Sequence, residues 1–147
     1  MATIDRTRTI AAPIEEIWDI LADFGAISAW ADNVEHSCIL VSEPEPVGTA
    51  RRLQVGRDTL VERIVEFDPP HTLAYDIEGL PKRLGQLTNR WTLQPAGTST
   101  TVTLTSTAEI GSRVDQQLAE RVMCRMLARQ SESMLAGLAQ RMENARV

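Results

Sequence analysis

The 147-residue sequence contains few of the residues that enzyme and metal sites most often use. It has two histidines and two cysteines, and Cys38 and Cys124 match no spacing of a metal-binding or redox motif. We expect both thiols to be reduced and partly buried, and we expect no metal and no cofactor. Glycine-rich phosphate loops, Gly-x-Ser-x-Gly elbows and His-Glu-x-x-His helices are also absent. The motifs alone therefore specify no enzyme.

Long apolar runs and strong basic clusters are missing as well. No stretch approaches the roughly 18 residues that a membrane span needs, and residues 1–13 lack the apolar centre of a signal peptide. We expect a cytoplasmic protein without integral membrane association. The net charge of -5 argues against a nucleic-acid partner, because phosphate binding needs clustered positive charge.

What the sequence does contain is typical of one globular domain over residues 1–147. Residues 3–11 are predicted to form a strand, and Pro13 to open a short helix. A second short helix follows over residues 25–31. Between residues 34 and 108, short β-rich runs alternate with turn signals, which predicts about six antiparallel strands.

From Ser112 onward the sequence predicts one long amphipathic helix, with Ser112 capping its first turn. An apolar face in its first half is expected to point inward; it consists of Leu118, Val122, Met123, Met126 and Leu127. Gln130, Ser133 and Gly137 interrupt that face. Either the helix leaves the core there, or a notch faces a cavity.

Period-two alternation assigns the inner faces of the strands. Leu104 lies on the apolar side of a strand whose other side carries threonines. The same logic turns Tyr75 and Ile77 inward on one strand, and Leu87, Asn89 and Trp91 on another. The strand at residues 59–67 is different, because both of its faces carry charge. Alternation puts Leu60, Glu62, Ile64 and Glu66 on one face and Val61, Arg63, Val65 and Phe67 on the other.

Several motifs together resemble the START-like, or polyketide cyclase/dehydrase (SRPBCC), superfamily. They are "IAAPIEEIW" at residues 10–18, Phe24, Trp30, "PVGTARR" at 46–52 and "ERIVEFDPP" at 62–70. The resemblance covers nearly the whole chain and extends to the plant abscisic-acid receptors and the birch-pollen allergen. It implies an α+β helix-grip fold, in which a curved seven-stranded antiparallel sheet wraps round the long C-terminal helix. Two short helices would lie between the first and second strands, and an elongated apolar cavity between sheet and helix.

The resemblance also implies roles for the charged strand. Glu62 would point into the cavity between Leu60 and Ile64, with Arg63 outward; the alternative is a solvent-reaching pair at the sheet edge. Either Arg51 or Arg52 would face inward, and alternation does not decide which. The candidate ligand-binding residues are Trp30, Arg52, Leu60, Glu62, Ile64, Tyr75, Ile77, Asn89, Trp91, Leu104, Val122, Met126 and Gln130.

Family members bind lipids, quinones, sterols, hormones or polyketides, so the fold leaves function open. The first hypothesis is a non-catalytic binder or carrier of a small hydrophobic molecule such as a lipid, quinone or polyketide. The second is a polyketide cyclase or dehydratase, with Glu62 as general acid or base and Arg52 or Tyr75 stabilising an enolate. The third, a protein-interaction module, is disfavoured because no large apolar surface patch is evident.

Ala31 stands where the plant abscisic-acid receptors carry a lysine, which argues against recognition of that hormone. The loop at 79–85 suits a lid or a plain solvated loop.

Overall fold

The computed structural model describes residues 1–79, 85–111 and 113–145. The predicted cap Ser112 and most of the predicted lid loop lie outside these residues. The elements in chain order are β1 (Ala2–Ile10), α1 (Ile14–Ala22), the 3-10 helix η1 (Phe24–Ala29), β2 (His36–Val41), β3 (Ala50–Val55), β4 (Asp58–Asp68), β5 (Thr72–Glu78), β6 (Gln86–Ala96), β7 (Ser99–Glu109) and α2 (Val114–Ala145).

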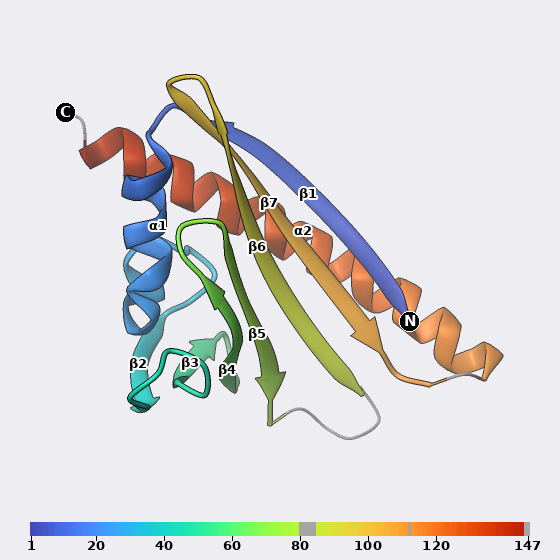
Figure 1. Ribbon diagram of the computed structural model, residues 1–147. Coiled ribbons are helices and arrows are strands. Elements are labelled where there is room, and N and C mark those ends of the chain that lie inside the picture. Colours follow the sequence, from blue (N-terminus) through green and yellow to red (C-terminus); the bar gives the residue numbers. More distant parts are fainter. Residues whose placement is uncertain (80–84, 112, 146–147) are drawn as a thin grey trace.

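The seven strands form one antiparallel sheet in the order β1-β7-β6-β5-β4-β3-β2. Helix α2 runs along β1 and β7, while α1 and η1 lie at one end of the sheet (Figure 1). This is the predicted helix-grip architecture, with both short helices between β1 and β2. None of the described helices is both long enough and apolar enough to cross a membrane.

The registers of two strand pairs decide which charges face inward. Val55 pairs with Asp58 across a two-residue turn, so Arg51 lies opposite Glu62 on β3 and β4. Arg63, the next residue on β4, points to the outer face and pairs with Glu78 there, with 2.7 Å between Arg63 Nε and Glu78 Oε1. The prediction that Glu62 turns inward and Arg63 outward is confirmed by these positions.

A bulge between Ile64 and Glu66 then shifts the register of β4 against β5. Beyond the bulge, Phe67 turns toward the core and meets the Trp18 ring edge-on at 5.2 Å, while Glu66 pairs with Arg90 on the outside. Strict alternation placed Glu66 with Glu62 and Phe67 with Arg63, which is wrong because the extra residue reverses the two faces.

The inner face of α2 differs from the one predicted for its first half. The residues that α2 buries are Glu120, Cys124, Leu127, Ala128, Ser131, Met134, Leu135, Gly137, Leu138, Ala139 and Met142. They recur every three or four residues, so they form one continuous strip. Val122 and Met126 lie on the opposite side and are 53% and 60% exposed, which contradicts their prediction as cavity residues.

Contacts with segments outside the helix explain why a strip containing Glu120 is the buried one. Glu120 accepts hydrogen bonds from the Met1 ammonium at 2.8 Å and from the Ile110 amide at 2.7 Å. These bonds hold the pKa of Glu120 below its usual range, so the carboxylate is ionised and satisfied. Cys124 is buried as predicted, whereas Cys38 is exposed on β2, contrary to the expectation of partial burial.

Gly137 explains part of the predicted notch in α2. It is buried against η1, and a Cβ atom at this position would collide with the carbonyl oxygen of Trp30. The glycine therefore allows the helix to approach the η1 backbone closely. At this point the notch meets the Trp30 backbone, at the edge of a small pocket of about 210 Å³ between α2 and residues 29–32.

Candidate functional site

A cleft of about 340 Å³ lies between the sheet and the middle of α2. Its volume is at the lower end of the range of about 300–1,000 Å³ that is typical of small-molecule sites. The β3–β4 hairpin, the end of β5 and the start of β6 form one wall, and α2 forms the other. Its lining residues are Val55, Asp58, Thr59, Leu60, Ile77, Gly79, Leu87, Met123, Leu127 and Gln130. Most of these side chains are apolar, so the cleft suits an apolar molecule with few polar groups.

A buried ion pair lies beside this cleft. Arg51, Glu62, Ile77 and Leu87 are successive partners across β3, β4, β5 and β6. Ile77 and Leu87 line the cleft, and opposed side chains on neighbouring strands have Cβ atoms about 5 Å apart. Glu62 is therefore the next side chain beyond the cleft wall in this row, and Arg51 follows it.

The ion pair is held by hydrogen bonds within the protein. Both Nη2 and Nε of Arg51 contact one carboxylate oxygen, Glu62 Oε1, at 2.7 and 2.8 Å. Arg51 Nη1 donates to the carbonyl oxygen of Phe24 at 2.9 Å, and the guanidinium lies 3.8 Å from the centre of the Phe24 ring. All three guanidinium nitrogens thus have a protein partner. Arg51 and Glu62 are 2% and 4% exposed.

The two effects on the Glu62 carboxyl oppose each other. Burial raises the pKa of Glu62 above its ordinary value, because a charged group loses hydration inside the protein. The positive charge and hydrogen bonds of Arg51 act in the lowering direction, but the net pKa shift is upward. The charge of the Glu62 carboxyl therefore depends on Arg51, because the guanidinium favours the ionised form that burial disfavours.

A second polar row follows the first, one step further from the cleft. Tyr75, Asn89 and Ser106 are partners across β5, β6 and β7. Ser106 Oγ donates to Asn89 Oδ1 at 2.7 Å and lies 3.4 Å from Ser131 Oγ of α2. The row therefore ties three strands to the helix through buried hydroxyl and amide groups.

The Tyr75 hydroxyl is part of this network and accepts a hydrogen bond from Trp91 Nε1 at 3.2 Å. Burial and the negative charge of Glu62 raise the pKa of Tyr75 to about 12, against the lowering effects of Arg51 and the hydrogen bonds. The hydroxyl is protonated at neutral pH. It can donate a hydrogen bond but cannot serve as an anionic base.

Aromatic packing fills the interior between η1 and the sheet. The ring centres of Trp30 and Trp91 are 5.8 Å apart in an edge-on contact, and those of Phe24 and Tyr75 are 5.6 Å apart. The predicted ligand contacts that lie in this packed region are Trp30, Ile64, Tyr75, Asn89, Trp91 and Leu104. The resemblance predicts an elongated cavity between sheet and helix. Side chains fill the part of this space near η1, and the cleft lies at the opposite end.

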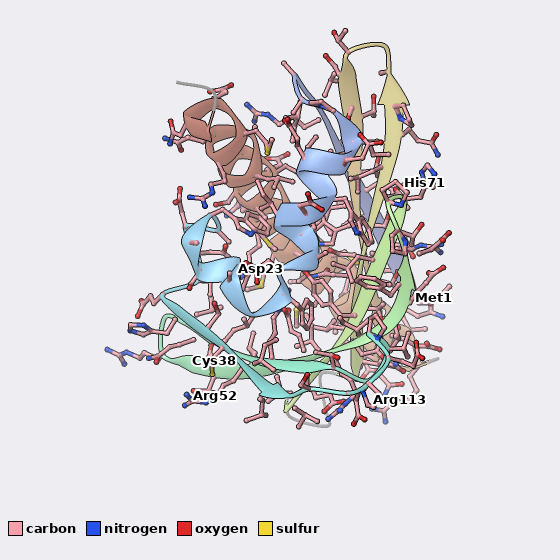
Figure 2. The ribbon with its side chains drawn as sticks, turned by 60° about the vertical axis from the view of Figure 1, so that its left-hand side comes forward. Met1, Asp23, Cys38, Arg52, His71 and Arg113 are labelled. Atoms are coloured by element: carbon pink, nitrogen blue, oxygen red, sulfur yellow. The ribbon has the colours of Figure 1, made fainter. Side chains whose placement is uncertain are left out.

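Three predicted site residues line the cleft itself: Leu60, Ile77 and Gln130. Gln130 is exposed at the rim, so this part of the predicted notch does face an open space. The choice of Arg52 is wrong. Arg52 is exposed and pairs in register with Cys38 of β2, and Figure 2 shows the two together at the margin of the sheet.

The sequence left open whether Arg51 or Arg52 faces inward, and the predicted ligand contacts include neither Arg51 nor several of the lining residues. The sequence held a signal for Arg51, because "GRD" at 56–58 permits a two-residue turn. Such a turn places residue 51 opposite residue 62, and opposed residues share a face. Leu87, Met123 and Leu127 were already on predicted inner faces but were not chosen as ligand contacts. Within the described residues, no group of three or more His, Cys, Asp or Glu side chains could hold a metal ion.

Residues 1–143 match the family model described as "Polyketide cyclase / dehydrase and lipid transport". The chain belongs to this family. The polyketide cyclase/dehydrase and lipid transport family fits the observed architecture, and its description covers both leading hypotheses from the sequence. No protein with a curated description matches the sequence.

Several solved structures share the fold of this chain. The Zhui aromatase/cyclase from Streptomyces sp. R1128 superposes with a TM-score of 0.81 at 20% identity, covering 99% of this chain and 96% of that one. A protein from Thermobifida fusca gives a TM-score of 0.79 at 26% identity, with 96% and 93% covered. A START superfamily protein from Mycobacterium smegmatis gives 0.76 at 19% identity, with 97% and 98% covered. The likeness to the Zhui and M. smegmatis proteins is one of fold, because both are below 25% identity.

Proposed function

We propose that this member of the polyketide cyclase/dehydrase and lipid transport family binds a small hydrophobic molecule in the cleft between β4–β6 and α2. The observation that carries the proposal is the apolar cleft of about 340 Å³, which is lined by Leu60, Ile77, Leu87, Met123 and Leu127. Burial of apolar ligand surface would drive binding. The polar side chains of the lining, Asp58, Thr59 and Gln130, would orient the ligand.

The buried polar groups support binding more than catalysis. Arg51 and Glu62 bond to each other and to the Phe24 carbonyl, and Tyr75 bonds to Trp91. A general acid or base has to reach the reacting group within hydrogen-bond distance. Glu62 is instead the next side chain beyond the cleft wall in its row, and Tyr75 lies in the following row. There the two residues stiffen the sheet around the ligand.

A titration with the apolar fluorescent dye 1-anilinonaphthalene-8-sulfonate tests the proposal. Ile77→Trp puts a large ring into the cleft, whereas Val65→Trp adds the same ring on the exposed face of neighbouring β4. We expect saturable dye binding by the wild type and by Val65→Trp, and at least tenfold weaker binding by Ile77→Trp. Equal binding by all three proteins would reject the cleft as the site.

A cyclase or dehydratase is the second candidate, because Glu62 has a raised pKa and adjoins the cleft wall. Glu62 would then exchange a proton with a poly-β-ketone after a small rearrangement of its bond to Arg51. Turnover of a short poly-β-ketone mimic by the wild type, lost in Glu62→Gln with dye binding retained, would support this mechanism. Turnover that survives Glu62→Gln would reject it.

A further inference from the structure

The outer side of α2 carries a row of large apolar side chains that the rest of the fold leaves open. Val114, Leu118, Val122 and Met126 are 83%, 62%, 53% and 60% exposed. They follow one another at intervals of four residues, so they form one ridge along the helix, here called the outer ridge. Isolated exposed apolar residues are ordinary, but a contiguous row of four marks an interaction surface.

The outer ridge points away from the body of the protein. The buried strip of α2 runs through Glu120, Cys124 and Leu127, and at 100° per residue Val122 lies on the opposite side of the helix. A groove of about 510 Å³ runs beside the ridge, between Leu118, Val122 and Met126 and the neighbouring Ile110, Ala119 and Met123. Among the described residues, Asp115 is the one charged residue of this lining, and its Oδ1 atom lies 3.5 Å from Arg113 Nε. The expectation that the surface offers no large apolar patch is therefore wrong.

A row of positive charge adjoins the ridge. Arg121, Arg125 and Arg129 are exposed and also recur every four residues, which makes them the next row on the helix surface. No ion pair joins any of the three to another residue in the described part of the chain. The protein as a whole carries a net charge of -5, so this basic row is a local departure from its overall charge.

The groove also leads to the ligand cleft. Met123 lines both the groove beside the outer ridge and the cleft. The next cleft residue on α2 is Leu127, and Gln130 follows at the rim. An apolar molecule could therefore pass from the ridge to the cleft along the side of α2 that carries Met123 and Leu127.

We infer that the outer ridge and its arginine row dock on an anionic lipid surface, from which an apolar ligand enters the cleft. An apolar row beside basic residues is the pattern of helices that lie in a membrane interface. The arginines complement anionic headgroups, and the ridge inserts at the boundary of the acyl chains. The entry of a ligand rests on the proposed function; the docking itself does not.

A second copy of the chain is a less suitable occupant. Around Val122, antiparallel pairing of two outer ridges would bring Asp115 near Arg129 of the other copy. It would also gather the remaining arginines of both helices along one side, where like charges repel. The contact would involve only about four turns of one helix from each copy, a small area for a stable dimer.

Co-sedimentation with lipid vesicles tests the docking. We expect the wild type to bind vesicles of equal phosphatidylglycerol and phosphatidylcholine, and to bind phosphatidylcholine alone much more weakly. Arg121→Gln with Arg125→Gln should weaken binding about thirtyfold, from the contribution of two basic side chains near an anionic surface. Leu118→Ser with Val122→Ser should abolish binding. These positions are exposed, so the variants should fold normally.

Arg52→Gln with Arg57→Gln removes the same charge from exposed positions elsewhere and should leave vesicle binding unchanged. Equal loss in this control, or no binding by the wild type, would overturn the proposal. A wild-type dimer in sedimentation equilibrium that Val122→Glu dissociates would also overturn it, since a second copy would then cover the ridge.

The variant Ile77→Trp separates the docking proposal from the cleft proposal, and it should bind vesicles normally. If Ile77→Trp still bound the dye as well, the cleft proposal would fail while the docking stood.

Discussion

Arg51 and Glu62 face each other across the β3–β4 hairpin, with Arg51 Nη2 2.7 Å from Glu62 Oε1, and neither residue is more than 4% exposed. The pair lies in the same inner row as two cleft residues, Ile77 and Leu87. Two opposite charges inside a protein hold each other in place, because either one alone would be costly to bury. The pair therefore fixes the geometry of the strands next to the cleft wall.

Removal of only one partner should be strongly destabilising. Arg51→Met leaves the Glu62 carboxylate buried without its cation, and we expect a loss of about 3–5 kcal/mol in the free energy of unfolding. The double variant Arg51→Met with Glu62→Leu should recover most of this loss, because no charge is then buried. Urea unfolding of the two single variants and the double variant measures the coupling; purely additive effects would contradict the account.

The cost of Arg51→Met should depend on pH. The pKa of Glu62 in the folded protein lies above its ordinary value of 4.5, so folding favours the protonated carboxyl. This contribution is fully present below about pH 4.5 and is lost as the pH rises through the folded pKa. Without Arg51 the pKa rises further, so Arg51→Met should be least destabilising in acid and most destabilising at neutral pH. A penalty that is constant across this range would show that Glu62 does not titrate as described.

Tyr75 gives a clean optical test, because it is the only tyrosine of the sequence. Its pKa of about 12 in the folded protein lies above the ordinary value of 10, so folding favours the protonated phenol. Stability should therefore fall as the pH rises from about 10 through 12. Ultraviolet titration of the phenolate should show no ionisation near pH 10 unless the protein unfolds. A midpoint near 10 in the folded protein would place the hydroxyl in contact with water.

Gly137→Ala should destabilise the protein although alanine is the better helix former. In an exposed helix this change would stabilise by about 1 kcal/mol. Here the added Cβ meets the Trp30 carbonyl oxygen, and we expect a net loss of about 1–3 kcal/mol in the free energy of unfolding. Gln140→Ala, at an exposed position of the same helix, should change it little. A Gly137→Ala protein at least as stable as the wild type would mean that α2 does not lie this close to η1.

Strand alternation identified much of the inner face from the sequence. It turned Tyr75 and Trp91 inward, the resemblance turned Glu62 inward, and all three are buried. It was wrong at Glu66 and Phe67, because a bulge inserts one residue and reverses the faces beyond it. Alternation also could not decide which of Arg51 and Arg52 faces inward. That depends on the register of β3 against β4, which the turn between them sets.

The long helix shows the limit of local patterns. Its most apolar face in the first half, through Leu118 and Val122, is the exposed one. The buried strip contains Glu120 and Ser131, whose partners lie far away in the sequence, at Ile110 and Met1 for the first and at Ser106 for the second. A window of helix sequence contains no information about such partners. For the same reason the sequence could not show how much of the cavity Trp30 and Trp91 fill.

Native mass spectrometry of the purified protein, followed by extraction of any co-purifying molecule, shows whether the cleft carries an apolar ligand. We predict a wild-type species that carries a discrete apolar molecule, retained by Val65→Trp and absent from Ile77→Trp. The same molecule bound equally to Ile77→Trp, or a wild type that carries nothing and fails to bind the dye, would contradict the account.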